Sequence, residues 1–252
     1  MKKLLLLSFA LMVVLIIGCD PDPGTPEPTT TTLSLNFDGQ FGDDELVLFQ
    51  YYDYQNGDSV FINVAHFFVS NITLLNGTEE TMIKDIDVLD FTNNHLEANG
   101  EPEKIIIEDV PVGNYTGIRI GLGVDSILNH TIPADYALGH PLANASEYWD
   151  WRETYIFGKF EGKIKESPDS SFFYAYHPGT DELYRTPTFT KTISLEGGVE
   201  ASINFTIDFE KLFQQGNDKI DIKNNSISHT GQADLWLATL IMDNLEAAIE
   251  IE

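Results

Sequence analysis

The sequence is nearly free of cysteine. Cys19 is the only cysteine among the 252 residues, and it lies at the end of an apolar N-terminal run. One thiol excludes disulfide bonds within the chain and metal sites built from several thiolates. Any metal bound by the rest of the chain must therefore use ligands other than cysteine.

Basic residues are also scarce. Lysine and arginine number 14 against 40 aspartates and glutamates, and the formal net charge is −26. Such a surface repels nucleic acid and offers no polybasic patch for anionic lipid. The acidic excess favours a cation or a neutral partner, although solubility alone accounts for much of it.

Familiar catalytic motifs are missing as well. The sequence contains no GxSxG, no HExxH and no phosphate-binding loop. A glycoside-hydrolysing pair of carboxylates stays open, because so many acidic residues produce chance pairs. The acidic run DGQFGDDE at 38–45 lacks the EF-hand spacing and is more typical of a hairpin loop. We therefore expect a protein that is not an enzyme.

The N-terminus has the pattern of an export signal. Lys2 and Lys3 precede an apolar run over 4–17, which is short for a membrane span. The run ends in IIGC at 16–19, which resembles a bacterial lipobox; an ordinary signal peptide is the alternative. We expect a lipoprotein signal peptide over 1–18, a lipid on Cys19 and a Pro/Thr/acidic tether over 19–32. This predicts anchoring at the outer membrane or cell surface, facing the periplasm or the exterior.

Strand patterns dominate residues 33–252. Many short stretches are rich in β-branched and aromatic residues, and turn signals separate them. The stretches are 33–37, 45–49, 59–75, 82–91, 104–110, 115–124, 154–162, 171–177, 188–195 and 199–208. They predict an all-β domain, an antiparallel β-sandwich in the immunoglobulin-like style. Short helices are predicted at 208–215, capped by Asp208, and near the C-terminus at 231–248.

Aromatic and imidazole residues gather in the middle of the chain. Trp149 and Trp151 lie within EYWDWRETYIFGKFEG (147–162), with His130 upstream and His177 downstream. On a strand the two tryptophans would point the same way and form one aromatic wall. The cluster is compatible with core packing, a sugar-stacking platform or a soft-metal site.

The order of these segments resembles the MbnP-like copper-binding proteins. It runs GLGVDSILNH (121–130), ADYALGHPLA (134–143), the 147–162 block and YAYHPGT (174–180), and FFVSNITLL (67–75) and IDFEKLF (207–213) also match. The resemblance spans roughly 33–252. It implies an envelope β-sandwich that binds copper through imidazoles and, in some members, through a tryptophan oxidised to kynurenine. A dihaem peroxidase-like enzyme performs that oxidation in some systems.

Candidate ligands follow from the resemblance residue by residue. His130 and His177 match family histidines, and Trp149 and Trp151 match the W-x-W pair; which tryptophan is modified stays open. This chain has Glu147 where many members have methionine. It also has His66 where relatives often have lysine or arginine, which makes His66 a third candidate.

Two functions compete, and a family member with a structural role and no ligand is a third alternative. The first is copper capture or storage, as Cu(I) or Cu(II), and it predicts that His130 and His177 converge. The second is glycan binding or adhesion, and it predicts exposed, coplanar rings of Trp149 and Trp151. His95 and His140 have the pattern of loop residues, and His229, in ISHTG, is a minor metal candidate.

Overall fold

The computed structural model describes residues 29–167 and 170–252. The predicted signal peptide, Cys19 and most of the predicted tether lie outside these residues. No helix in the described ranges is both long enough and apolar enough to cross a membrane.

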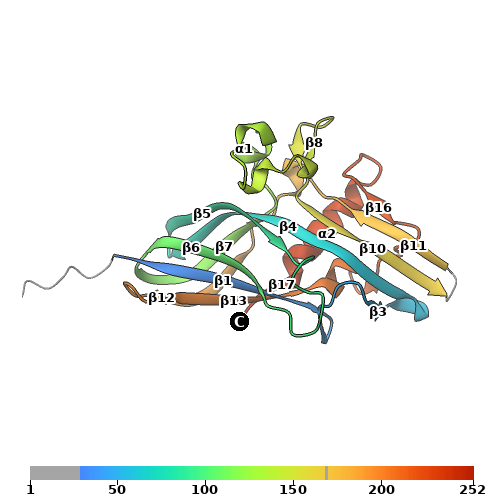
Figure 1. Cartoon of the computed structure of the whole chain (residues 1–252), viewed down its shortest axis with the longest axis horizontal. Helices are drawn as coiled ribbons and strands as arrows, with labels where there is room; N and C mark the ends of the chain where they lie inside the picture. Colours follow the sequence, from blue (N-terminus) through green and yellow to red (C-terminus); the bar gives the residue numbers. More distant parts are fainter. Residues whose placement is uncertain (1–28, 168–169) are drawn as a thin grey trace, which may run out of the picture.

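Two sheets form the predicted all-β sandwich (Figure 1). The first sheet has the order β17–β13–β1–β2, with β6 also paired to β1; its strands are β1 (Thr30–Phe41), β2 (Asp44–Glu45), β6 (Glu103–Pro111), β13 (Ala201–Asp208) and β17 (Ile249–Ile251). The second sheet has the order β12–β7–β4–β10–β11–β16, with β3 and β5 also paired to β4. Its strands are β3 (Tyr51–Asp53), β4 (Ser59–Asn76), β5 (Glu79–Asp90), β7 (Gly113–Leu122), β10 (Gly158–Ser167), β11 (Ser170–Tyr176), β12 (Thr188–Leu195) and β16 (Ile227–Ser228).

Two strand pairs are parallel, whereas the prediction was an antiparallel sandwich. β1 runs parallel to β13, with Phe37 opposite Phe205, and β11 runs parallel to β16. The Phe37 and Phe205 rings stack with their centroids 4.7 Å apart. Each parallel pair joins segments far apart in the sequence, so no hairpin signal could reveal it.

The core lies between the sheets and is completed by the C-terminal helix. Along β1, buried and partly exposed residues alternate, as a strand with one buried face requires. Helix α2 (Leu235–Ala248) confirms the predicted helix, although it begins four residues later than expected; it buries Leu237, Ile241 and Leu245. The predicted 208–215 helix is a short 3-10 turn, η6 (Phe209–Phe213), and Asp208 does cap it by accepting from the Glu210 N–H.

Residues 123–157 form a connecting segment between β7 and β10 (Figure 1). It contains α1 (Ser126–Asn129), η2 (Pro133–Asp135), η3 (Pro141–Ala143), η4 (Ala145–Glu147), β8 (Tyr148–Trp149) and β9 (Thr154–Tyr155). Asp125 caps α1 by accepting from the Ile127 N–H. The ribbon places α1 and β8 together at one side of the sandwich, so this segment carries His130, Trp149 and Trp151 outside the two sheets. Smaller elements elsewhere are η1 (Gln55–Gly57), η5 (Asp181–Leu183), β14 (Gln214–Gln215) and β15 (Asp218–Lys219).

Candidate functional site

A row of imidazole and charged side chains crosses one face of the second sheet. His66 on β4 lies opposite Asp90 on β5 and opposite Lys159 on β10. Continuing the register of β10, β11 and β16 by one residue places His177 beside Lys159 and His229 beside His177. Directly opposed residues project to the same face of a sheet. The fold therefore assembles half of the histidines of the chain on one surface.

His177 and His229 form a stacked pair, called here the histidine pair. Their ring centroids are 4.9 Å apart and the rings are nearly parallel, at 13°. The Nε2 atom of His177 lies 2.8 Å from Glu161 Oε1. Burial lowers the pKa of His177, the neighbouring His229 and Lys159 lower it further, and Glu161 opposes the change. The surroundings of His177 therefore favour its neutral imidazole, the form that binds a metal.

His66 is held in a different network, centred on Glu147. Glu147 is 7% exposed, and its Oε2 lies 3.2 Å from His66 Nε2 while its Oε1 accepts from Lys159 Nζ at 2.9 Å. Burial by itself would raise the pKa of Glu147, but hydrogen bonds from His66 and Lys159 outweigh burial and lower the pKa to about 2. The two departures from the family pattern, Glu147 and His66, are thus partners of each other.

His130 lies at the C-terminal end of α1 and contacts Asp181. Its Nε2 is 3.0 Å from Asp181 Oδ2, and the Asn129 side chain donates to the other oxygen of Asp181 at 2.7 Å. Asn129 also accepts from the Tyr155 N–H at 2.8 Å. Over 29–167 and 170–252, no hydrogen bond or ring contact joins His130 to His177. The structure brings His229, in place of His130, to His177.

The two tryptophans lie on a tight hairpin and not on one continuous strand. Trp149 ends β8, whereas Trp151 lies in the turn at 150–153 and is 68% exposed. The rings still meet, with centroids 5.7 Å apart and planes inclined by 42°. The Arg152 guanidinium covers both rings, at 4.6 Å from the Trp151 centroid and 5.6 Å from the Trp149 centroid. Tilted rings under a cation do not form the coplanar platform that glycan stacking predicts.

The tryptophan hairpin contacts both loops that follow the histidine pair. Trp149 lies against Gly179, where an added Cβ would be 3.0 Å from Cζ3 of the indole. Arg152 Nη2 donates to the Thr230 carbonyl at 2.6 Å. The Thr230 hydroxyl in turn donates to the His177 carbonyl and accepts from the Gly179 N–H, both at 3.1 Å. Tryptophans and the histidine pair therefore belong to one site.

The donor set at this site is small. In the part of the chain that the structure describes, no group of three or more His, Cys, Asp or Glu side chains is arranged to hold a metal. Two neighbouring imidazoles and Glu161 are what the site provides. Imidazole suits copper, so the chemistry of these donors fits a copper ion held by few protein ligands.

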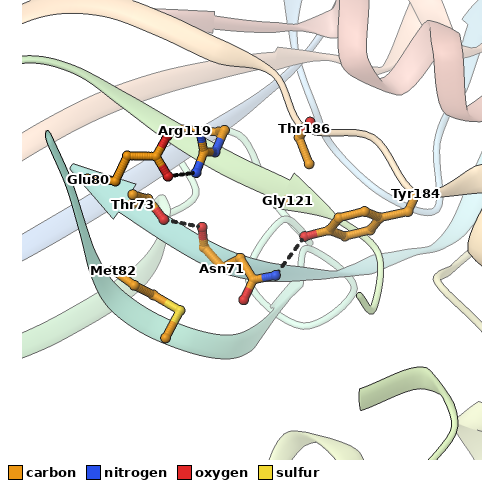
Figure 2. Close-up of a pocket in the computed structure, with 8 residues that line it drawn as sticks. All are labelled: Asn71, Thr73, Glu80, Met82, Arg119, Gly121, Tyr184 and Thr186. Atoms are coloured by element: carbon orange, nitrogen blue, oxygen red, sulfur yellow. Dashed lines mark hydrogen bonds and ion pairs between the residues drawn. The ribbon is translucent and has the colours of Figure 1, made fainter. Parts of the chain in front are cut away.

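A separate pocket lies on the second sheet beside β4 (Figure 2). Its volume is about 530 Å³, and it is lined by Asn71, Thr73, Glu80, Met82, Arg119, Gly121, Tyr184 and Thr186. Arg119 donates to both oxygens of Glu80, and the Tyr184 hydroxyl meets Ser70 and the Asn71 amide. The FFVSNITLL motif thus builds an irregular stretch of β4 that seats Tyr184. The pocket is lined by no histidine and adds nothing to the candidate metal donors.

Sequence reasoning missed three contributors to the site. His229 was only a minor metal candidate behind His130, His177 and His66, and Glu161 and Arg152 were two charges among many. Their roles depend on contacts with residues 16 to 78 positions away in the chain. The EG of the 147–162 block, which includes Glu161, was the single signal that could have drawn attention to one of them.

Comparison with known proteins identifies the family. The MbnP family model matches residues 30–231. The solved structure of MbnP from Methylosinus trichosporium aligns with a TM-score of 0.50 and 15% identity, and the alignment covers 81% of this chain and 82% of that one. At this identity the likeness shows a shared fold. A search of curated proteins found no match.

Proposed function

Because the chain belongs to the MbnP family, we propose that it is a copper-binding protein of the bacterial envelope, with a role in copper capture or storage and no catalytic activity. The observation that carries the proposal is the histidine pair. Two stacked imidazoles, one of them partly buried and with a lowered pKa, stand next to the two tryptophans of the family motif.

Each residue of the site has a distinct task in this proposal. His177 and His229 bind the ion through imidazole nitrogens. Glu161 fixes the ring of His177 by its contact with Nε2, as a carboxylate commonly does for a ligating histidine. Lys159 adds a positive charge nearby, which opposes a cation, while Glu147 neutralises part of that charge through its 2.9 Å contact.

The tryptophan hairpin is the second part of the proposal. Trp151 is the more exposed ring, so a dihaem peroxidase-like partner could approach it from solvent. Trp149 contacts Gly179, two residues after His177. Oxidation of either tryptophan would place a new polar group beside the metal donors.

Anchoring through Cys19 is also proposed. It rests on the N-terminal pattern of a lipoprotein signal peptide followed by a Pro/Thr/acidic tether. The first described strand begins at Thr30, so only about ten residues separate the folded domain from the predicted lipid. The domain would therefore stay close to the membrane surface, facing the periplasm or the exterior.

The test is metal analysis of the full chain purified from its native host. We expect close to one copper per chain by elemental mass spectrometry, and loss of that copper in His177→Ala and in His229→Ala. His130→Ala is the matched control, because His130 is a family-motif histidine that contacts Asp181 instead. Mass analysis of the peptide containing Trp149 and Trp151 reports any oxidation.

Three outcomes decide between the alternatives. Copper lost in His130→Ala but kept in His229→Ala would overturn the histidine pair and restore the ligand set implied by the family resemblance. Copper kept in all three variants would reject imidazole ligation by these residues. No copper after loading with Cu(I) under reducing conditions would refute copper binding itself.

A further inference from the structure

A second surface feature lies farther along the same face of the second sheet. Tyr51 on β3 is opposite Phe61 on β4, Phe61 is opposite Lys163 on β10, and Lys163 is opposite Phe173 on β11. Four neighbouring strands thus present one straight row of three aromatic rings and a lysine. Lys165 lies one pair farther along β10, with its Nζ 5.4 Å from the centroid of Tyr51. These five residues are called here the aromatic–lysine patch.

The patch is apolar, exposed and positively charged. Phe173 is 72% exposed and Tyr51 46% exposed. Lys163 Nζ lies 4.9 Å from the Phe173 centroid and 5.7 Å from the Phe61 centroid. In the described ranges neither Lys163 nor Lys165 pairs with a carboxylate, whereas six other lysines do. Among the described residues of a chain with 40 acidic side chains, these two lysines thus stand among exposed rings without a carboxylate partner.

The complementary surface lies on the first sheet of the same chain. Ile106 is 62% exposed and lines a groove of about 360 Å³ together with Glu200. A neighbouring groove of about 320 Å³ also includes Glu200 and adds Glu108 and Asp109. No lysine or arginine lines either groove. These four residues define the acidic groove, which has an exposed apolar centre like the patch but the opposite charge.

The two surfaces lie at opposite ends of the elongated sandwich (Figure 1). The acidic groove is at the end where β1 begins, and the patch is at the end where β3 pairs with β4 and where β10 turns into β11. They also belong to different sheets. A single copy therefore cannot bring the patch and the groove into contact with each other, but two copies placed head to tail can.

We propose that this chain self-associates head to tail, with the aromatic–lysine patch of one copy docked on the acidic groove of the next. The exposed rings and Ile106 supply the apolar contact, and the lysines meet the carboxylates across it. Acidic surfaces elsewhere repel one another, which restricts the contact to this one arrangement. Such a contact is heterologous and does not close on itself, so it produces chains of copies along the membrane surface.

The experiment is sedimentation velocity of the full chain in mild detergent, over a range of protein concentrations and at low and high salt. We expect the average mass to rise with concentration at low salt and to return to the monomer value near 1 M salt, where screening is strong. Lys163→Glu/Lys165→Glu and Glu108→Lys/Glu200→Lys should each raise the dissociation constant about tenfold or more, because like charges then face each other. Lys84→Glu changes a lysine outside both surfaces and should leave association unchanged.

Mixing the two charge-reversed variants makes the test specific. The lysine variant keeps a normal acidic groove and the glutamate variant keeps a normal patch, and the reversed patch and reversed groove also carry opposite charges. An equimolar mixture should therefore associate again, with the two variants in alternating order. Melting curves that match the wild type would show that both variants are folded. Lys163→Gln/Lys165→Gln removes the two positive charges without reversing them and is a milder second variant of the patch. A wild-type chain that stays monomeric, or charge-reversed variants that associate like the wild type, would overturn the proposal. A mixture of the two variants that remains monomeric would also overturn it.

Discussion

Replacing Glu147 with glutamine removes the buried charge that joins the connecting segment to the second sheet. Glu147 contacts His66 and Lys159 from the two neighbouring strands, and its pKa is lowered from 4.5 to about 2. Each pKa unit corresponds to about 1.4 kcal/mol, so the ionised carboxylate stabilises the fold by about 3 kcal/mol relative to an unperturbed glutamate. Glu147→Gln should therefore lower the free energy of unfolding by about 3 kcal/mol at pH 7.

The same contribution should depend on pH in a defined direction. Because the pKa of Glu147 is lower in the folded than in the unfolded chain, its stabilisation is complete above the unfolded value and is lost as the pH falls toward 2. About 2 kcal/mol of it should be gone at pH 3. The stability difference between wild type and Glu147→Gln should shrink by that amount, since glutamine does not titrate.

Urea unfolding of both proteins at pH 7 and at pH 3 measures this difference. Glu101→Gln is the matched control, because Glu101 pairs with Lys104 at the surface, where such pairs contribute little. A difference between wild type and Glu147→Gln that is equal at the two pH values would refute the reasoning. It would mean that the Glu147 network stabilises the fold by shape and hydrogen bonding and not by its charge.

Three further predictions concern the site. Gly179→Ala should lower the free energy of unfolding by about 1–3 kcal/mol and shift the tryptophan fluorescence. The reason is that the added Cβ would lie 2.4 Å from the Tyr155 carbonyl oxygen and 3.0 Å from Trp149. An unchanged fluorescence spectrum and an unchanged urea midpoint would contradict this packing. Arg152→Met should change the fluorescence intensity, because it removes the cation from both indole rings and the donor to the Thr230 carbonyl; a spectrum identical to the wild type would argue against the contact. Copper affinity should fall less on acidification from pH 7 to 5 than it would for two exposed histidines, because the lowered pKa of His177 reduces proton competition at that ligand; a fall in competition assays as steep as that of two exposed histidines would disprove this.

The sequence determined what depends on neighbours along the chain. Alternating apolar residues along β1 specify a strand with one buried face, and the spacing of Leu237, Ile241 and Leu245 specifies a helix that packs on the sandwich. Asp208 marked a helical turn through its local hydrogen bond. The order of the motifs was enough to indicate the family, because order survives when individual positions change.

Tertiary structure decided which of these elements meet. The parallel pairing of β1 with β13 joins residues 168 positions apart, and the pairing of Glu147 with His66 joins residues 81 apart. No local pattern encodes such contacts, since they follow from the sum of packing over the whole sandwich. For the same reason the sequence pointed to His130 as the partner of His177, and it took the register of β11 and β16 to bring His229 there instead. The sequence likewise has no basic cluster that would point to the aromatic–lysine patch. Only the pairing of β3, β4, β10 and β11 brings its two lysines among aromatic rings from three other strands.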